Sequence, residues 1–111
     1  MDAEVTAYIG LGSNRGDRYM NLRQAVSALD AHDDVRVVRT SPVYRSEAHV
    51  RDARDSTAPF MNAVLQLRTS LQPVNLLRVC QAIERQGGRT RDSSEAWKAR
   101  PIDLDLLVYD T

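Results

Sequence analysis

The order of hydrophobic periods along the chain limits its possible folds more than any other feature. Short segments that alternate or run apolar, as strands do, flank two longer segments with apolar residues at helical spacing. The resulting order, β-α-β-β-α-β, predicts an α+β, ferredoxin-like fold in which an antiparallel sheet carries two helices on one face. The expected strands are 5–11, 35–40 (resuming at 43–44), 60–67 and 102–109; the helices begin after Asn14 or Asp17 and at 70–73, and end at 32–34 and 87–88.

The composition fits one domain, residues 1–111, with a single core. Fifteen basic residues balance fifteen acidic ones, so no net field draws the chain to nucleic acid or to a membrane. Cys80 lies in an apolar helical pattern that predicts burial. Because it is the only cysteine in the sequence, an intrachain disulfide is excluded. The sequence has no signal-peptide pattern and no apolar run of membrane length, so we expect a cytoplasmic protein and leave its oligomeric state open.

The last predicted strand carries two acidic residues on one face. Ile102, Leu104 and Leu106 alternate with Asp103 and Asp105, so the carboxylates point the same way. At roughly 3.3 Å per residue they lie about 6.6 Å apart and repel each other. A hard cation such as Mg²⁺ would relieve that repulsion. A solvated strand face is the alternative reading, although aspartate is depleted in strands.

A cationic segment leads into this strand. Its basic residues are Arg89, Arg91, Lys98 and Arg100. Arginine suits bidentate phosphate recognition, and Trp97 can stack on a base or position the segment. Phosphoryl transfer needs both Mg²⁺ and cations, so the two features together favour nucleotide chemistry over a merely solvated charge run.

Two further motifs have both a structural and a functional reading. The sequence 10–14, Gly-Leu-Gly-Ser-Asn, lies between the first strand and helix, where a tight turn with a cap is favoured over an anion site. At the start of the third strand, the Asn62 amide offers a donor and an acceptor to a heterocycle, and Phe60 can pack against its ring. An ordinary strand start explains Phe60 and Asn62 equally well. The polar segment 47–59 is expected to be a long exposed loop, of a length that is usually functional or mobile.

Taken in order, five motifs resemble the 6-hydroxymethyl-7,8-dihydropterin pyrophosphokinase family of folate biosynthesis. They are Gly12-Ser13-Asn14, 41–46 (Ser-Pro-Val-Tyr-Arg-Ser), Phe60-Met61-Asn62, Glu84-Arg85 with 88–91 (Gly-Arg-Thr-Arg), and 100–105 (Arg-Pro-Ile-Asp-Leu-Asp). The resemblance implies Mg²⁺-dependent transfer of pyrophosphate from ATP to the hydroxymethyl oxygen of the pterin, with release of AMP. Its expected partners are therefore ATP and the hydroxymethyl-dihydropterin, with no nucleic acid and no membrane.

The same resemblance implies roles for individual residues. Asp103 and Asp105 would hold two Mg²⁺ ions. The implied catalytic set is Arg89, Arg91, Arg100, Asp103 and Asp105. The implied ATP-binding set is Glu84, Arg89, Lys98 and Arg100, and the implied pterin-binding set is Tyr44, Phe60, Asn62 and Trp97.

The chain departs from the family pattern in three places. A Pro-x-Gly-like turn is replaced by 47–51, Glu-Ala-His-Val-Arg, and the usual Arg-Trp-Gly-Pro-Arg by 96–100, Ala-Trp-Lys-Ala-Arg. The sequence ends at Thr111, whereas family members usually continue, so it resembles a short form without the usual C-terminal segment. The alternative is a catalytically weak or inactive relative that binds a pterin or a nucleotide. A ferredoxin-like RNA-binding domain is a weaker alternative, because the charge is balanced and the sheet lacks aromatic residues.

Overall fold

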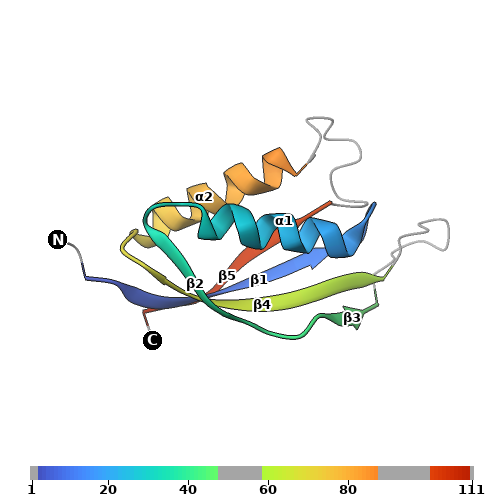
Figure 1. The fold of residues 1–111 in the computed structure, drawn as a ribbon, viewed down its shortest axis with the longest axis horizontal. Helices are drawn as coiled ribbons and strands as arrows, with labels where there is room; N and C mark the ends of the chain where they lie inside the picture. Colours follow the sequence, from blue (N-terminus) through green and yellow to red (C-terminus); the bar gives the residue numbers. More distant parts are fainter. Residues whose placement is uncertain (1–2, 48–58, 88–100, 111) are drawn as a thin grey trace.

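Five strands form one antiparallel sheet, and both helices lie over the same face of it (Figure 1). The structure, a computed structural model, describes residues 3–47, 59–87 and 101–110. The strand order is β2-β4-β1-β5, with β3 also paired to β4, which confirms the expected α+β architecture. The elements are β1 (Val5–Ser13), α1 (Arg18–Asp30), β2 (Val35–Thr40), β3 (Tyr44–Ser46), β4 (Phe60–Thr69), α2 (Pro73–Gln86) and β5 (Asp103–Tyr109).

The core lies between the helices and one face of the sheet. Alternate residues of β1 and β4 point toward the helices, while those between them face the other way. Each Å² of apolar surface removed from water contributes roughly 25 cal/mol, so this layer is the main source of stability. The buried apolar residues include Ala7, Ile9, Leu11, Leu22, Ala25, Leu29, Leu65, Leu67, Leu76, Cys80, Ile83, Ile102 and Leu104.

The connection from β1 to α1 differs from its expected form. The first strand continues to Ser13, so Gly10 and Gly12 belong to the strand rather than to a turn. The turn follows, with Gly16 at a φ of 68°, a backbone conformation that favours glycine. Asp17, one of the two expected caps, begins α1 by accepting a hydrogen bond from the Met20 backbone N–H at 3.1 Å.

The second helix ends where the sequence predicts, but for a different reason. Gly87 is the C-cap of α2 with a φ of −74°, so it does not adopt a left-handed conformation. A Cβ atom at Gly87 would lie only 2.7 Å from Cγ2 of Ile102. Glycine is therefore needed at this position because the end of α2 closely approaches the chain just before β5.

A register shift interrupts the pairing of β1 with β5. Tyr8 pairs with Val108 and Ile9 with Leu106, so Leu107 is an extra residue on the β5 side, as in a β-bulge. The shift leaves the side chains of Leu107 and Val108 53% and 42% exposed, respectively. It also turns Tyr109 toward the core, where its hydroxyl donates a hydrogen bond to the Leu71 carbonyl at 2.5 Å.

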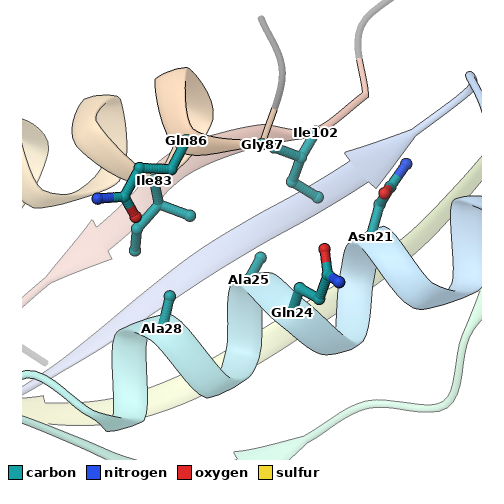
Figure 2. A pocket seen from close by; sticks show the side chains of 8 residues that line it. All are labelled: Asn21, Gln24, Ala25, Ala28, Ile83, Gln86, Gly87 and Ile102. Carbon is teal, nitrogen blue, oxygen red and sulfur yellow. The ribbon is translucent and has the colours of Figure 1, made fainter.

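A cavity of about 190 Å³ lies between the two helices. Figure 2 shows Ala25 and Ala28 on α1 opposite Ile83 on α2, with the amides of Gln24 and Gln86 at its border. Its small lining residues explain the space between the helices. The cavity lies on the helical side of the sheet, where the core side chains also lie.

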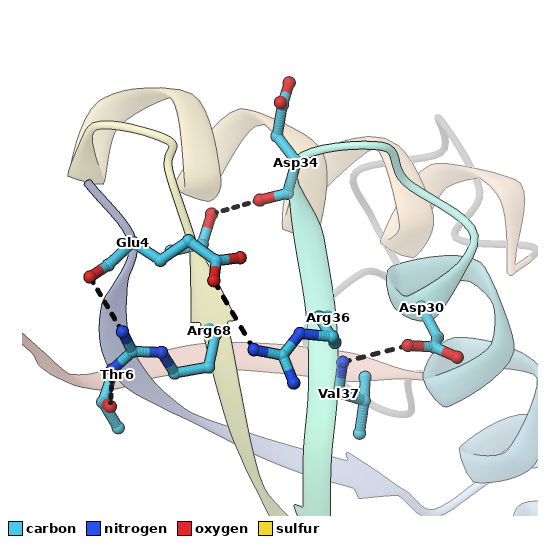
Figure 3. A network of polar contacts seen from close by, with 8 residues as sticks. Glu4, Thr6, Asp30, Asp34, Arg36, Val37 and Arg68 are labelled. Carbon is cyan, nitrogen blue, oxygen red and sulfur yellow. Dashed lines mark hydrogen bonds and ion pairs between the residues drawn. The ribbon is translucent and has the colours of Figure 1, made fainter. Parts of the chain in front are cut away.

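A polar network joins three strands at the end of the sheet where β1 begins (Figure 3). Arg68 donates hydrogen bonds to the Thr6 hydroxyl at 2.9 Å and to the Glu4 carbonyl at 3.1 Å, and Arg36 pairs with the Glu4 carboxylate at 3.5 Å. Exposed pairs of this kind contribute about 0–1 kcal/mol.

Within 3–47, 59–87 and 101–110, no helix is long and apolar enough to span a membrane.

Candidate functional site

Asp103 and Asp105 lie on the face of the sheet opposite the helices. They pair with Gly12 and Gly10 of β1, respectively. The residues that alternate with them, Ile102 and Leu104, are buried in the core. The predicted alternation is therefore confirmed: both aspartates point to the open face of the sheet, and Asp105 is the more exposed of the two.

The sheet register brings one aspartate into line with three residues that are distant in sequence. Tyr44 of β3 pairs with Asn62 of β4, Asn62 pairs with Gly12 of β1, and Gly12 pairs with Asp103 of β5. Directly paired residues project from the same face of a sheet. An aromatic ring, an amide, a position without a side chain and a carboxylate thus form a cross-strand row on the open face.

Gly12 keeps the middle of this cross-strand row free of a side chain. A Cβ atom at Gly12 would lie 3.3 Å from Oδ1 of Asn62 and 3.4 Å from Cδ1 of Phe60. The ring of Phe60 and the amide of Asn62 therefore both lie beside Gly12. In the neighbouring position, a Cβ atom at Gly10 would meet the side chain of Leu107 at 3.4 Å.

The amide of Asn62 is held in one orientation. Its Nδ2 donates hydrogen bonds to the Ser46 hydroxyl at 2.8 Å and to the Tyr44 carbonyl at 3.3 Å. Its Oδ1 is the atom nearest to the Cβ position of Gly12, and so faces the middle of the row. The amide thus presents an acceptor to a ligand with N–H groups. Sequence reasoning missed Ser46, since a serine at a strand end gives no signal of its partner.

Glu84 contacts the aspartate strand from α2. Its side chain is only 7% exposed, and its Oε2 accepts a hydrogen bond from the Leu104 backbone N–H at 2.9 Å. The family resemblance implies a role on the nucleotide side, and the sequence alone gives no sign of this backbone contact. The bonded N–H belongs to the residue between Asp103 and Asp105.

Cys80 lies one helical turn before Glu84 and is also buried. Burial raises the pKa of the Cys80 thiol to about 11, and the negative charges of Glu84 and Asp105 add to the shift. The thiol is therefore neutral at physiological pH, which argues against a role as a thiolate nucleophile.

The predicted cationic residues Arg89, Arg91, Lys98 and Arg100, together with Trp97, lie outside the described residues. What the structure gives is the position of the two flanks. The described chain leaves at Gly87 and returns at Pro101, and Gly87 is in close contact with Ile102. Both flanks of segment 88–100 thus adjoin the start of the aspartate strand.

The donors on the open face suit a hard cation but supply few ligands. In the described part of the chain, no group of three or more His, Cys, Asp or Glu side chains is placed to hold a metal ion. The two carboxylates of Asp103 and Asp105 offer oxygen donors, which Mg²⁺ and Ca²⁺ prefer. A cation bound here would need further oxygens, such as those of phosphate groups or water.

The fold and site define an α+β domain that presents two carboxylates, an amide and an aromatic ring on an open sheet face. The chain belongs to the 7,8-dihydro-6-hydroxymethylpterin-pyrophosphokinase (HPPK) family, whose model matches residues 8–111. Three relatives are each named 2-amino-4-hydroxy-6-hydroxymethyldihydropteridine pyrophosphokinase. The relative from Bacillus subtilis (strain 168) is 41% identical over 94% of this chain and 59% of its own length. The relative from Porphyromonas gingivalis (strain ATCC BAA-308 / W83) is 40% identical over 92% of this chain and 67% of its own length. The relative from Pseudomonas putida is 38% identical over 95% of this chain and 82% of its own length.

The chain thus spans 59% of the length of the Bacillus subtilis relative. The match begins at Tyr8, within β1, and includes every later described element. The cross-strand row, the aspartate pair and Glu84 all lie within residues 8–111, which the family model matches.

Proposed function

We propose that this chain forms the catalytic core of a pyrophosphokinase that transfers pyrophosphate from ATP to the hydroxymethyl oxygen of 6-hydroxymethyl-7,8-dihydropterin. The observation that supports it most is the cross-strand row of Tyr44, Asn62, Gly12 and Asp103, because it combines a heterocycle-reading amide with a carboxylate. Membership of the HPPK family supplies the reaction. We also propose that the protein is cytoplasmic, because the proposed reaction consumes ATP.

In this proposal the pterin lies against the row of β3, β4 and β1. The Oδ1 atom of Asn62 accepts a hydrogen bond from an N–H group of the pterin, while Phe60 and Tyr44 border the ring. The absence of a side chain at Gly12 leaves space beside the Asn62 amide. Pterins carry several N–H donors on one edge, which matches the acceptor that Asn62 presents.

We assign the nucleotide to the side of the row where Asp103 and Asp105 lie. Two Mg²⁺ ions, held by these carboxylates and by phosphate oxygens, would screen the triphosphate charge and help activate the hydroxyl nucleophile. Lys98, Arg89 and Arg100 would bind the phosphates, and Arg91 would steer them. Trp97 would close the segment that carries Arg91 and belongs to the pterin-binding set. Support for these cationic assignments comes from the family motif and from the two flanks of segment 88–100, which adjoin the aspartate strand.

We also assign the domain to the ferredoxin-like folds. The support is the strand order β2-β4-β1-β5 and the two helices on one face of the antiparallel sheet. In this assignment β2 and β3 together take the place of the second strand, since both pair with β4. This fold is shared by proteins of many activities, so it does not carry the functional proposal.

The first test measures turnover by the 111-residue chain with ATP, Mg²⁺ and the hydroxymethyl pterin. We expect AMP formation that depends on the pterin, and we expect Asp103→Asn to lower it by at least a hundredfold while the thermal unfolding midpoint stays near that of the parent chain. Asp33→Asn, on the turn after α1, is the matched control and should retain full activity. Pterin binding without AMP, measured calorimetrically at high protein concentration, would replace the enzyme assignment by a non-catalytic binding protein.

A further inference from the structure

We propose that Glu84 is a positioning residue, which fixes the aspartate strand by binding the backbone N–H between the two aspartates. The carboxylate reaches β5 from α2, and its Oε2 lies 2.9 Å from the Leu104 nitrogen. Both partners are buried, at 7% exposure for Glu84 and 5% for Leu104. The inference rests on the proposed function only in taking Asp103 and Asp105 as the metal-binding pair.

The hydrogen bond occupies a particular place in the pairing of β1 with β5. Residues on one strand of an antiparallel pair alternate between positions that bond to the partner strand and positions whose N–H points outward. Leu104 pairs with Leu11, and its N–H points to Glu84. The flanking positions, Asp103 and Asp105, are therefore the ones placed to bond to Gly12 and Gly10 of β1.

Within the described sheet, β5 is an edge strand and pairs only with β1. An outward N–H on such a strand must bond to water or to another group, because a buried unpaired donor costs about 1–3 kcal/mol. Glu84 supplies that group, with a charge-assisted bond that is stronger than a neutral one. The beginning of β5 is thus held from both sides, by β1 and by α2.

The position of Glu84 follows from how α2 packs. The core residues Leu76, Cys80 and Ile83 share a helical face with Glu84, and α2 contacts β5 among the strands. A carboxylate at the end of this apolar face reaches the strand edge without leaving the core. The Leu104 N–H that Glu84 binds lies between Asp103 and Asp105. The contact therefore keeps the two carboxylates at a fixed spacing and direction for the metal ion that they would share.

The test compares Glu84→Ala with Glu84→Gln. Glutamine keeps an oxygen acceptor for the Leu104 N–H but removes the charge, whereas alanine removes the acceptor. We expect hydrogen exchange of the Leu104 amide to be at least tenfold faster in Glu84→Ala, beyond any change at Leu65 in the central strand β4, which reports global unfolding. Outer partners of metal ligands typically affect affinity by 10–100-fold, so we expect Mn²⁺ affinity, measured by electron paramagnetic resonance, to fall roughly tenfold in the same variant.

Glu84→Gln should restore both quantities to within about threefold of the parent chain, and Arg85→Ala, on the exposed side of the same helical turn, should change neither. Equal exchange of Leu104 in Glu84→Ala and in the parent would overturn the inference, as would equal losses in the glutamine and alanine variants. If Glu84→Ala speeds exchange of the Leu104 amide but the parent chain binds no Mn²⁺, the proposed metal site fails while the contact of Glu84 with the strand stands.

Discussion

At the residue scale, the amide of Asn62 has a defined direction because its nitrogen is already bonded. The Ser46 hydroxyl accepts from Nδ2 at 2.8 Å, and the Tyr44 carbonyl accepts from it at 3.3 Å. An amide that was free to turn would offer a donor or an acceptor with similar ease. Ser46 therefore helps to direct the acceptor edge of the amide toward the middle of the cross-strand row.

Removal of the Ser46 hydroxyl should weaken pterin binding. A net hydrogen bond contributes about 0.5–1.5 kcal/mol, so we expect Ser46→Ala to raise the pterin Kd by roughly two- to tenfold in calorimetric titrations. Ser46→Thr retains the hydroxyl and should bind within twofold of the parent chain. Ser70→Ala, which removes a hydroxyl bonded to Asp34 at the other end of β4, serves as the control. Unchanged affinity in Ser46→Ala would show that Asn62 needs no such support.

At the scale of single elements, β1 has two glycines with unequal surroundings. A Cβ at position 12 meets the Asn62 amide and the Phe60 ring at 3.3–3.4 Å, whereas one at position 10 meets only the exposed, flexible side chain of Leu107 at 3.4–3.6 Å. Overpacking a tight position costs about 1–3 kcal/mol. The two glycines thus form a matched pair within one strand.

We expect Gly12→Ala to raise the pterin Kd by roughly tenfold or more, because the new methyl group displaces Asn62 or Phe60. Gly10→Ala should bind the pterin within about twofold of the parent chain, since Leu107 can turn aside. Fluorescence titration with the hydroxymethyl pterin measures both, and circular dichroism checks that both variants fold. Equal losses in the two variants would mean that Gly12 matters only for strand stability.

The elements also show what a sequence can and cannot predict. The facing of Asp103 and Asp105 was predictable because alternation within one strand is a local property. The row that joins Asp103 to Asn62 was not, because register depends on pairing between distant segments. The glycines at 10 and 12 suggested a turn, but they lie within β1 opposite the aspartates. The contacts of Ser46 and Glu84 depend on the packing of separate elements, which no local pattern encodes.

At the scale of the whole molecule, Gly87 joins the helical layer to the sheet. A methyl group there would lie 2.7 Å from Cγ2 of Ile102, a β-branched residue that is 3% exposed, so Ile102 or the end of α2 would have to shift. The close approach fixes the end of α2 against the start of the aspartate strand. Global stability and the position of the proposed site therefore share one contact.

Gly87→Ala should accordingly lower the free energy of unfolding by about 1–3 kcal/mol. Each kcal/mol corresponds to a fall of a few °C in Tm for a domain of this size. Differential scanning calorimetry measures the change, and Gln86→Ala, an exposed substitution at the preceding residue, should leave Tm nearly unchanged. A Tm for Gly87→Ala equal to that of the parent chain would show that α2 and Ile102 separate without cost.

The extra residue in β5 bears on how this strand tolerates changes of length. Upstream of Leu107 the side-chain phase sets the aspartates outward, and downstream of it the phase sets Tyr109 inward. Because the two requirements are out of step by one residue, the bulge reconciles them. If these seven residues alternated regularly, Asp105 and Tyr109 would share one face and only one requirement would be met. Deletion of Leu107 would instead restore regular alternation, with the aspartates still outward and Tyr109 still inward. The phase of the side chains, rather than the length of the strand, is thus the constrained property, and the bulge adjusts that phase within seven residues.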